Sequence, residues 1–368
     1  MLEGGRVNNR QAALILPFLA VMPTAVLFVP AITAIFAKQN GWLSLLVVAT
    51  VFGLLVALVA VKLGLRFPGQ TVVEYAPEIL GPYLGKLVGA GFVFWFIHLD
   101  AVIIREYSAF LMTAFMPETP QVVFAVFQAL LAVIAVRGGL EVICRAGEWV
   151  FVVFILSLVI ILGLVVHDAD FTELLPVLEN GVKPVIHGGL TPSAFRGEVV
   201  LMLMLLPYIN QPQKTLKYLF ASVILMGITL AQATVVATSE FGIMTESLTF
   251  PLFSLARFIS VFGFIERLES LILIMWVAGV SVKVAVFYYV AALGAAQLFN
   301  LKDYRPVALP IGVILAAWSV SLFEDSREVV EWLIISFPPY AHTFQLLIPS
   351  LLLLVAVLRK KGGTENGG

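Results

Sequence analysis

One stretch of the sequence carries two opposite charges inside a segment long enough to cross a membrane. Residues 193–212 are mostly apolar and match the length of a transmembrane helix, about 20 residues. Arg196, Gly197 and Glu198 lie in its first turns, where ionisable side chains are costly unless they face protein, water or a ligand. A glycine there lets a helix open and present free backbone groups. The pattern predicts ligand contacts from Phe195 to Glu198; the alternative is that both charges snorkel to the outer headgroups.

The first apolar segment, residues 11–36, contains a second candidate break. Prolines stand at positions 17, 23 and 30, and each removes a backbone donor from the helix. Two interrupted helices at matching positions in two halves of a chain indicate a binding site near the middle of the membrane. The alternative is that the prolines only bend the helix for packing. The candidate ligand-binding residues here are Met22, Pro23, Thr24 and Ala25.

A small zwitterion suits a site built from two opened helices. Its carboxylate would accept hydrogen bonds from the free amides of an opened helix end. Its ammonium would bind opened carbonyl groups or the carboxylate of Glu198.

The third apolar segment, residues 84–115, carries an unusual number of ionisable groups. His98 and Arg105 are seven residues apart and share a helix face, whereas Asp100 lies on another face. Such groups indicate a polar lining inside the bundle, to which Asp100 is expected to contribute a ligand contact. For Arg105 and Glu106 we expect a coupling or structural role, such as an ion pair between Arg105 and a carboxylate on a neighbouring helix.

The eighth apolar segment, residues 265–298, is long and carries a lysine in its interior. At 1.5 Å per residue, Lys283 is about 25 Å below Glu266, which predicts Glu266 near the outer interface and Lys283 near the inner one. Lys283 then either snorkels or supplies a fixed positive charge where a coupling cation would otherwise bind.

The composition establishes a polytopic membrane protein. The 368 residues are 61% hydrophobic and 12% charged, with a mean hydropathy of +1.03. The single Cys144 excludes a disulfide framework, and the four scattered histidines lack metal-ligand spacing. We expect no metal, cofactor or nucleic acid. An enzyme is the least favoured class, because the sequence contains no recognisable nucleophile–base pair.

Ten membrane spans are predicted, with boundaries at Pro, Gly or charged residues. They cover residues 11–36, 42–65, 84–115, 121–136, 147–166, 193–212, 216–238, 265–298, 306–323 and 342–358. One set of connections holds most Lys and Arg residues, and the opposite set gathers the acids, so both termini are expected in the cytoplasm. The fold class is therefore an all-α polytopic bundle in a single membrane domain, with discontinuous first and sixth helices. Its two five-helix inverted repeats cover residues 11–167 and 191–359, followed by a cytoplasmic tail at 360–368.

Two connections on the acidic side are expected to contain short helices. Residues 250–259 predict a helix that dips into the outer mouth as a lid, and residues 324–332 show a similar pattern. The alternative is an amphipathic helix that only rests on the membrane surface.

Several motifs, in order along nearly the whole chain, carry a resemblance to a known family. They are Gly41-Trp42-Leu43-Ser44, Phe67-Pro68-Gly69-Gln70-Thr71, Arg105-Glu106-Tyr107-Ser108, Pro117-Glu118-Thr119-Pro120, Gly138-Gly139-Leu140-Glu141 with Arg145, and the run from Phe241-Gly242 through Phe250-Pro251-Leu252 to Glu266-Arg267-Leu268-Glu269 and Trp276. The chain resembles the spore germination permeases, the B subunits of spore nutrient germinant receptors, within the amino acid–polyamine–organocation transporter superfamily. It departs from relatives at Pro23-Thr24-Ala25, where they usually carry glycines, and at Phe195-Arg196-Gly197-Glu198, where they tend to have Phe-Glu.

The resemblance implies a function and partners that the residues alone do not give. It implies a receptor subunit in the inner membrane of a spore, working with an A subunit and a lipoprotein C subunit, with an amino acid or similar nutrient as germinant. A functional secondary amino-acid transporter, coupled to protons or a cation, is the alternative. In this architecture the eighth span lines the first where a coupling sodium can bind, so an ammonium from Lys283 there would make sodium unnecessary.

Overall fold

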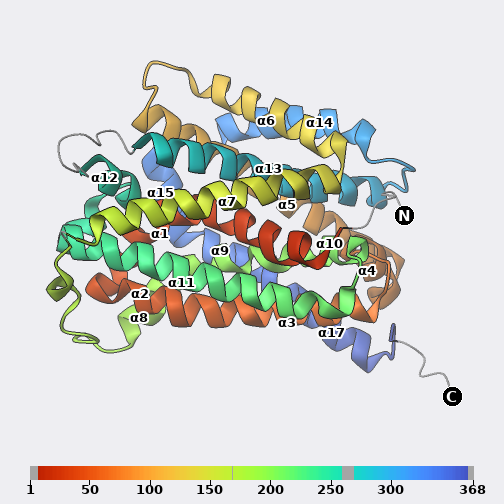
Figure 1. Ribbon diagram of the computed structural model, residues 1–368. Coiled ribbons are helices and arrows are strands. Elements are labelled where there is room, and N and C mark those ends of the chain that lie inside the picture. Colours follow the sequence, from red (N-terminus) through yellow and green to blue (C-terminus); the bar gives the residue numbers. More distant parts are fainter. Residues whose placement is uncertain (1–6, 168, 259–268, 364–368) are drawn as a thin grey trace.

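The computed structural model describes residues 7–167, 169–258 and 269–363, and within these ranges the chain is mostly helical (Figure 1). Inside a bilayer no water is available to bind backbone N–H and C=O groups. A helix pairs these groups within its own segment, so long apolar stretches of a membrane protein form helices. The first half contains η1 (Arg10–Ile15), α1 (Leu16–Ala37), η2 (Lys38–Asn40), α2 (Gly41–Leu43), η3 (Ser44–Ala49), α3 (Thr50–Arg66), α4 (Val72–Leu80), α5 (Pro82–Ala114), α6 (Gln121–Gly138) and α7 (Leu140–Val165).

The second half contains more short segments than the first. They are η4 (Phe171–Leu174), α8 (Lys183–Gly188), α9 (Leu190–Arg196), η5 (Gly197–Leu201), α10 (Met202–Leu205), η6 (Leu206–Tyr208), η7 (Pro212–Lys214), α11 (Thr215–Phe241), η8 (Gly242–Ser247), α12 (Pro251–Phe258), α13 (Glu269–Leu298), α14 (Arg305–Ser321), α15 (Ser326–Ile335), α16 (Phe337–His342), η9 (Thr343–Leu347) and α17 (Ile348–Leu358).

The helices confirm a multi-pass membrane protein. Within the described residues, 8 stretches are long and apolar enough to cross a membrane, or up to 9 if α14 and α15, bent by 100°, form one span. The first stretch, Arg10–Arg66, contains both the first and the second predicted spans. The total of ten spans stays a prediction.

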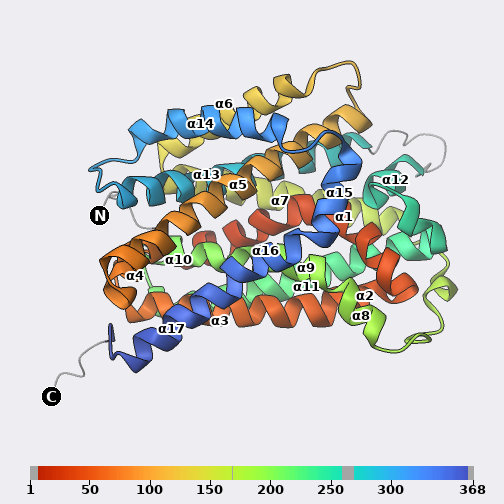
Figure 2. The same ribbon diagram turned by 180° about the vertical axis from the view of Figure 1, so that it is seen from behind.

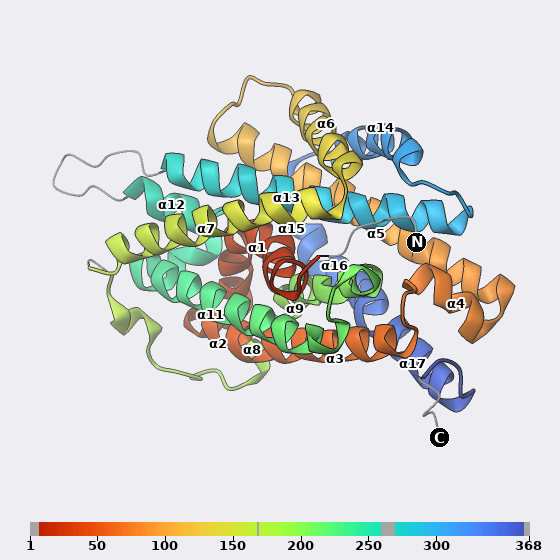
Figure 3. The same cartoon turned by 45° about the vertical axis from the view of Figure 1, so that its right-hand side comes forward.

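Helix α1 forms the centre of the bundle. Most of its side chains are buried, as expected for a helix that is apolar all round. It contacts α13, α11 and α9, and Figure 3 shows it with α13 and α7 on one side and α11 on the other. From behind, α15, α16 and α17 cross the face beside α9 (Figure 2). The start of η1 and the end of α17 lie at the same end of the bundle (Figure 1).

The predicted interruption of the first helix at Pro23–Ala25 is wrong. Helix α1 continues through Pro23 and Pro30. The ring of Pro23 packs against α13, where a Cβ added to Gly279 would lie 2.7 Å from the Pro23 Cγ. A proline removes only one backbone donor, and a closely packed neighbour keeps the helix intact around it. The observed contact favours the packing interpretation of this proline.

The predicted discontinuity of the sixth helix is confirmed near Arg196–Val199. Helix α9 ends at Arg196, the chain tightens into the 3₁₀ segment η5, and α10 resumes at Met202. Gln345 occupies the break: its Nε2 donates a 2.6 Å hydrogen bond to the Ala194 carbonyl. A Cβ added at position 197 would lie 2.0 Å from the Gln345 Oε1, so a larger residue there would force the Gln345 side chain to move.

Both short helices expected on the acidic side are present. The helix predicted at 250–259 corresponds to α12, and the one at 324–332 corresponds to α15. Asp325 caps α15 by accepting a hydrogen bond from the Glu328 backbone amide. Helix α12 packs against α1, α11 and α13, so it is part of the bundle.

Candidate functional site

A buried ion pair joins the three elements that the sequence singled out. The Lys283 Nζ on α13 donates to Glu198 Oε2 at 2.8 Å and to Oε1 at 3.1 Å. It also donates to the Thr24 hydroxyl on α1 at 2.8 Å. The middle of α1, the 3₁₀ segment η5 and the middle of α13 therefore meet at one ammonium group.

This pair excludes snorkelling for both of its members. The side chains of Lys283 and Glu198 have no solvent-exposed area. Lys283 is the fifteenth of 30 residues in α13, so it lies at mid-helix and the placement near the inner interface is wrong. The distance from Glu266 did not predict the depth of Lys283, because α13, at 1.5 Å per residue, is longer than the membrane core is thick. Glu266 itself lies outside the described residues.

Two aromatic rings complete the surroundings of the ammonium. Its Nζ lies 5.4 Å from the ring centre of Phe195 on α9 and 5.9 Å from that of Phe287 on α13. A cation within about 6 Å of a ring is attracted by the negative face of the π system. Phe195, a predicted ligand-binding residue, thus contributes to the cation site.

Two further buried carboxylates on α5 stand in the electrostatic field of Lys283. Asp100 and Glu106 both interact electrostatically with this ammonium, and Glu106 also with Glu198. Neither Asp100 oxygen has a hydrogen-bond partner among the described residues, and the same holds for Glu106 Oε2. Three buried carboxyl groups and one buried ammonium would carry an excess of negative charge if all were ionised, which protons or a cationic group must balance in a dry interior.

The other candidate residues of α1 and η5 provide walls and packing. Met22 and Ala25 are fully buried beside Thr24, and neither brings a polar side chain. Pro23 contacts α13, and Gly197 gives room to Gln345. These residues lie near Thr24 or Glu198 because they belong to the same segments, α1 and η5. Their part in ligand binding stays a prediction.

Arg196 lies on a different side of its segment from Glu198. Its Nη1 donates to the Thr50 hydroxyl on α3 at 3.0 Å and to the Val223 carbonyl on α11 at 3.3 Å. The side chain is fully buried, so it does not snorkel. The stem fills space over Gly53, where an added Cβ would lie 2.4 Å from the Arg196 Cγ. We therefore leave Arg196 out of the proposed ligand site.

Arg105 lies toward the acidic loops. It is 3% exposed and interacts electrostatically with Asp325 and Glu328 at the start of α15. It makes no salt bridge within 4.0 Å in the part of the chain that the structure describes. The expected ion pair on a neighbouring helix is thus present only as a longer-range attraction to α15.

Sequence reasoning missed the contribution of the segment from α16 to η9. His342 Nε2 lies 2.9 Å from the Ser193 Oγ, and Gln345 binds the opened turn of α9. The sequence signal was the presence of His342 and Gln345 in an otherwise apolar segment. Their spacing did not show that they would contact α9. No group of His, Cys, Asp and Glu in the described ranges could hold a metal ion.

Comparison with solved structures identifies the fold. A sodium-coupled sialic acid symporter, in a substrate-bound outward-open state, has a TM-score of 0.68 at 12% identity, covering 96% of this chain and 79% of the symporter. MhsT in complex with L-phenylalanine gives 0.67 at 12% identity, covering 96% and 99%. The chain is a multi-pass membrane protein with a transporter fold.

Comparison of sequences gives the family. The model of the spore germination protein family, a family of permeases, matches residues 6–327. Spore germination protein KB of Bacillus subtilis (strain 168) is 28% identical over 338 residues, which are 90% of each chain. Spore germination protein YndE of the same organism is 25% identical over 88% of this chain and 89% of its own. The chain belongs to the spore germination permease family.

Proposed function

We propose that this protein is the membrane subunit of a spore nutrient germinant receptor and binds a small zwitterion, of the amino acid class, at Glu198, Lys283 and Thr24. One observation carries this proposal: a fully buried ion pair links the interrupted helix to α1 and α13. Buried charges of this kind in membrane helices mark functional sites. The family and the transporter fold support the same assignment.

The geometry suggests how a zwitterion would bind. Its carboxylate would pair with the Lys283 ammonium, and its ammonium with Glu198 or the unpartnered Glu106 oxygen. A zwitterion can replace both halves of the internal ion pair at once, whereas a singly charged molecule leaves one half unpaired. Leaving a buried charge unpaired is costly, so the site selects for ligands that carry both charges.

The partners and the location belong to the same proposal. We place the protein in the inner membrane of a spore, with both termini in the cytoplasm, because the basic residues gather at that side. An A subunit and a lipoprotein C subunit would complete the receptor, as the family resemblance implies.

Secondary transport is the second candidate function, and the charge balance of the site favours protons as the coupling ion. Asp100, Glu106 and Glu198 outnumber Lys283, so protons must neutralise part of the cluster or a ligand ammonium must do so. Uptake of labelled amino acid into vesicles under a proton gradient, compared with binding alone, separates a transporter from a receptor that only senses.

Ligand binding is expected to be independent of sodium. The Lys283 ammonium already supplies a positive charge between α1 and α13, where it repels a sodium ion. Purified protein is heated with each standard L-amino acid in sodium buffer and in choline buffer. At least one amino acid should stabilise it equally in both, by about 2.7 kcal/mol at 100 times its Kd. Stabilisation in sodium alone would contradict the assigned role of Lys283, and no stabilisation by any amino acid would contradict the ligand class.

A further inference from the structure

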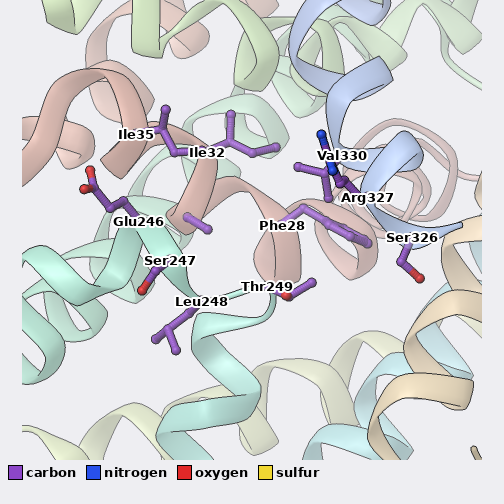
Figure 4. A pocket seen from close by; sticks show the side chains of 11 residues that line it. Phe28, Ile32, Ile35, Glu246, Ser247, Leu248, Thr249, Ser326, Arg327 and Val330 are labelled. Atoms are coloured by element: carbon purple, nitrogen blue, oxygen red, sulfur yellow. The ribbon is translucent and has the colours of Figure 1, made fainter.

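A cavity opens on the acidic side of the bundle, in the C-terminal half of α1, and Figure 4 shows the side chains that line it. It encloses about 270 Å³, just below the range of about 300–1,000 Å³ for drug-sized ligands. Helix α1, the connection from η8 to α12 and the start of α15 line this outer pocket. Such a volume suits a ligand of amino acid size.

The lining of the outer pocket combines an apolar wall with opposite charges. Phe28 and Ile32 of α1 form the wall together with Val330 of α15. Glu246 and Arg327 lie on opposite sides, as Figure 4 shows. An apolar wall between an acid and a base fits a zwitterion with an apolar side chain.

The two charges of the outer pocket differ in their present partners. Lys38 already forms a salt bridge with Glu246. Arg327 has no salt bridge within the ranges that the structure describes, so its guanidinium is available for a carboxylate. The adjacent Ser326 also lines the pocket and adds a hydroxyl donor.

Buried aromatic rings lie where the outer pocket comes nearest to the central ion pair along α1. Phe28 lines the pocket and lies one helical turn, about 6 Å along α1, from Thr24. Its ring lies 5.3 Å from that of Phe250, which lies 5.1 Å from that of Phe110. Phe28 is 2% exposed and Phe250 is 5% exposed, so we infer that a ligand moving inward along α1 would have to displace these rings.

We propose that the outer pocket is a second binding site, which holds a small zwitterionic amino acid with an apolar side chain before it reaches Glu198 and Lys283. The carboxylate binds Arg327 and the Ser326 hydroxyl, the side chain lies on Phe28, Ile32 and Val330, and the ammonium shares the Glu246 carboxylate with Lys38. The order in which a ligand would occupy the two sites rests on the proposed function, whereas binding to the outer pocket does not.

The test uses a thiol placed in the outer pocket of the full-length protein. Ser247→Cys adds an exposed thiol there, and the native Cys144 is buried, so background labelling is low. The rate of alkylation by a water-soluble maleimide is measured with L-valine as the probe. L-Valine at ten times its Kd should slow the rate about tenfold, whereas L-valinol, which lacks the carboxylate, should not.

Three second substitutions in the Ser247→Cys protein decide the interpretation. Arg327→Gln should remove the protection, and Arg257→Gln, at an exposed arginine outside the pocket, should preserve it. Glu198→Gln should also preserve it, because that side chain belongs to the central site. Absence of protection by L-valine, or protection that survives Arg327→Gln, overturns the outer site. Protection lost in Glu198→Gln also overturns it, since the thiol would then report closure driven by the central site.

Discussion

Lys283→Ala is expected to destabilise the protein by about 3–5 kcal/mol and to abolish ligand binding, because it leaves Glu198 buried without a partner. The loss has two parts: an uncompensated buried carboxylate, and a cavity where the lysine stem had packed. Thermal unfolding in detergent measures the loss of stability, and binding of the best amino acid from the screen measures the loss of affinity.

The neutral double variant Glu198→Gln/Lys283→Met is the matched control for this prediction. It removes both charges and roughly keeps the volume, and such replacements of buried ion pairs are often neutral or stabilising. We expect near-native stability without ligand binding. A double variant that binds as the native protein does would show that the pair only holds the helices together. A single Lys283→Ala variant with native stability and binding would contradict the whole account of this residue.

Glu198→Gln is expected to raise the germinant concentration for half-maximal germination roughly 10- to 100-fold when spores are compared at matched protein level. The amide oxygen still accepts a hydrogen bond from the Lys283 Nζ, but the variant loses the charge-assisted bond to a ligand ammonium, worth about 1.5–3 kcal/mol. Dose–response curves of spores carrying the variant measure it.

Glu331→Gln, at an exposed glutamate on α15, is the control for a general effect of lost negative charge. It should leave the half-maximal concentration unchanged. An unaltered response in Glu198→Gln would mean that this carboxylate serves only the internal ion pair.

The broad architecture was predictable because membrane helices must be long, apolar and bounded by polar residues. The interruption at Gly197 was readable too, since a glycine between two charges has few other uses inside a membrane helix. The interruption at Pro23 was not, because whether a proline breaks a helix depends on what packs against it. Here α13 supplies Gly279 at the point of contact, and sequence spacing cannot show that neighbour.

Glu198, Thr24 and Lys283 each stood out as single residues, but their partnership did not. Pairing across α1, η5 and α13 depends on helix rotation and depth, which are set by packing throughout the bundle. The depth of Lys283 was misjudged because α13 is longer than the membrane core is thick, so counting residues from one end does not fix a depth. Arg196 stood out in the sequence for the same reason as Glu198, but it is not part of the ion pair. Its side chain packs over Gly53 and donates to the Thr50 hydroxyl on α3.

A structure of the protein bound to its best amino acid tests the central claim most directly. We expect the ligand between α1, η5 and α13, with its carboxylate at the Lys283 ammonium and the direct Glu198–Lys283 contact opened or shared. Density elsewhere, with the Lys283 Nζ still bound only to Glu198 and Thr24 as it is now, would contradict the assignment of this ion pair as the germinant site.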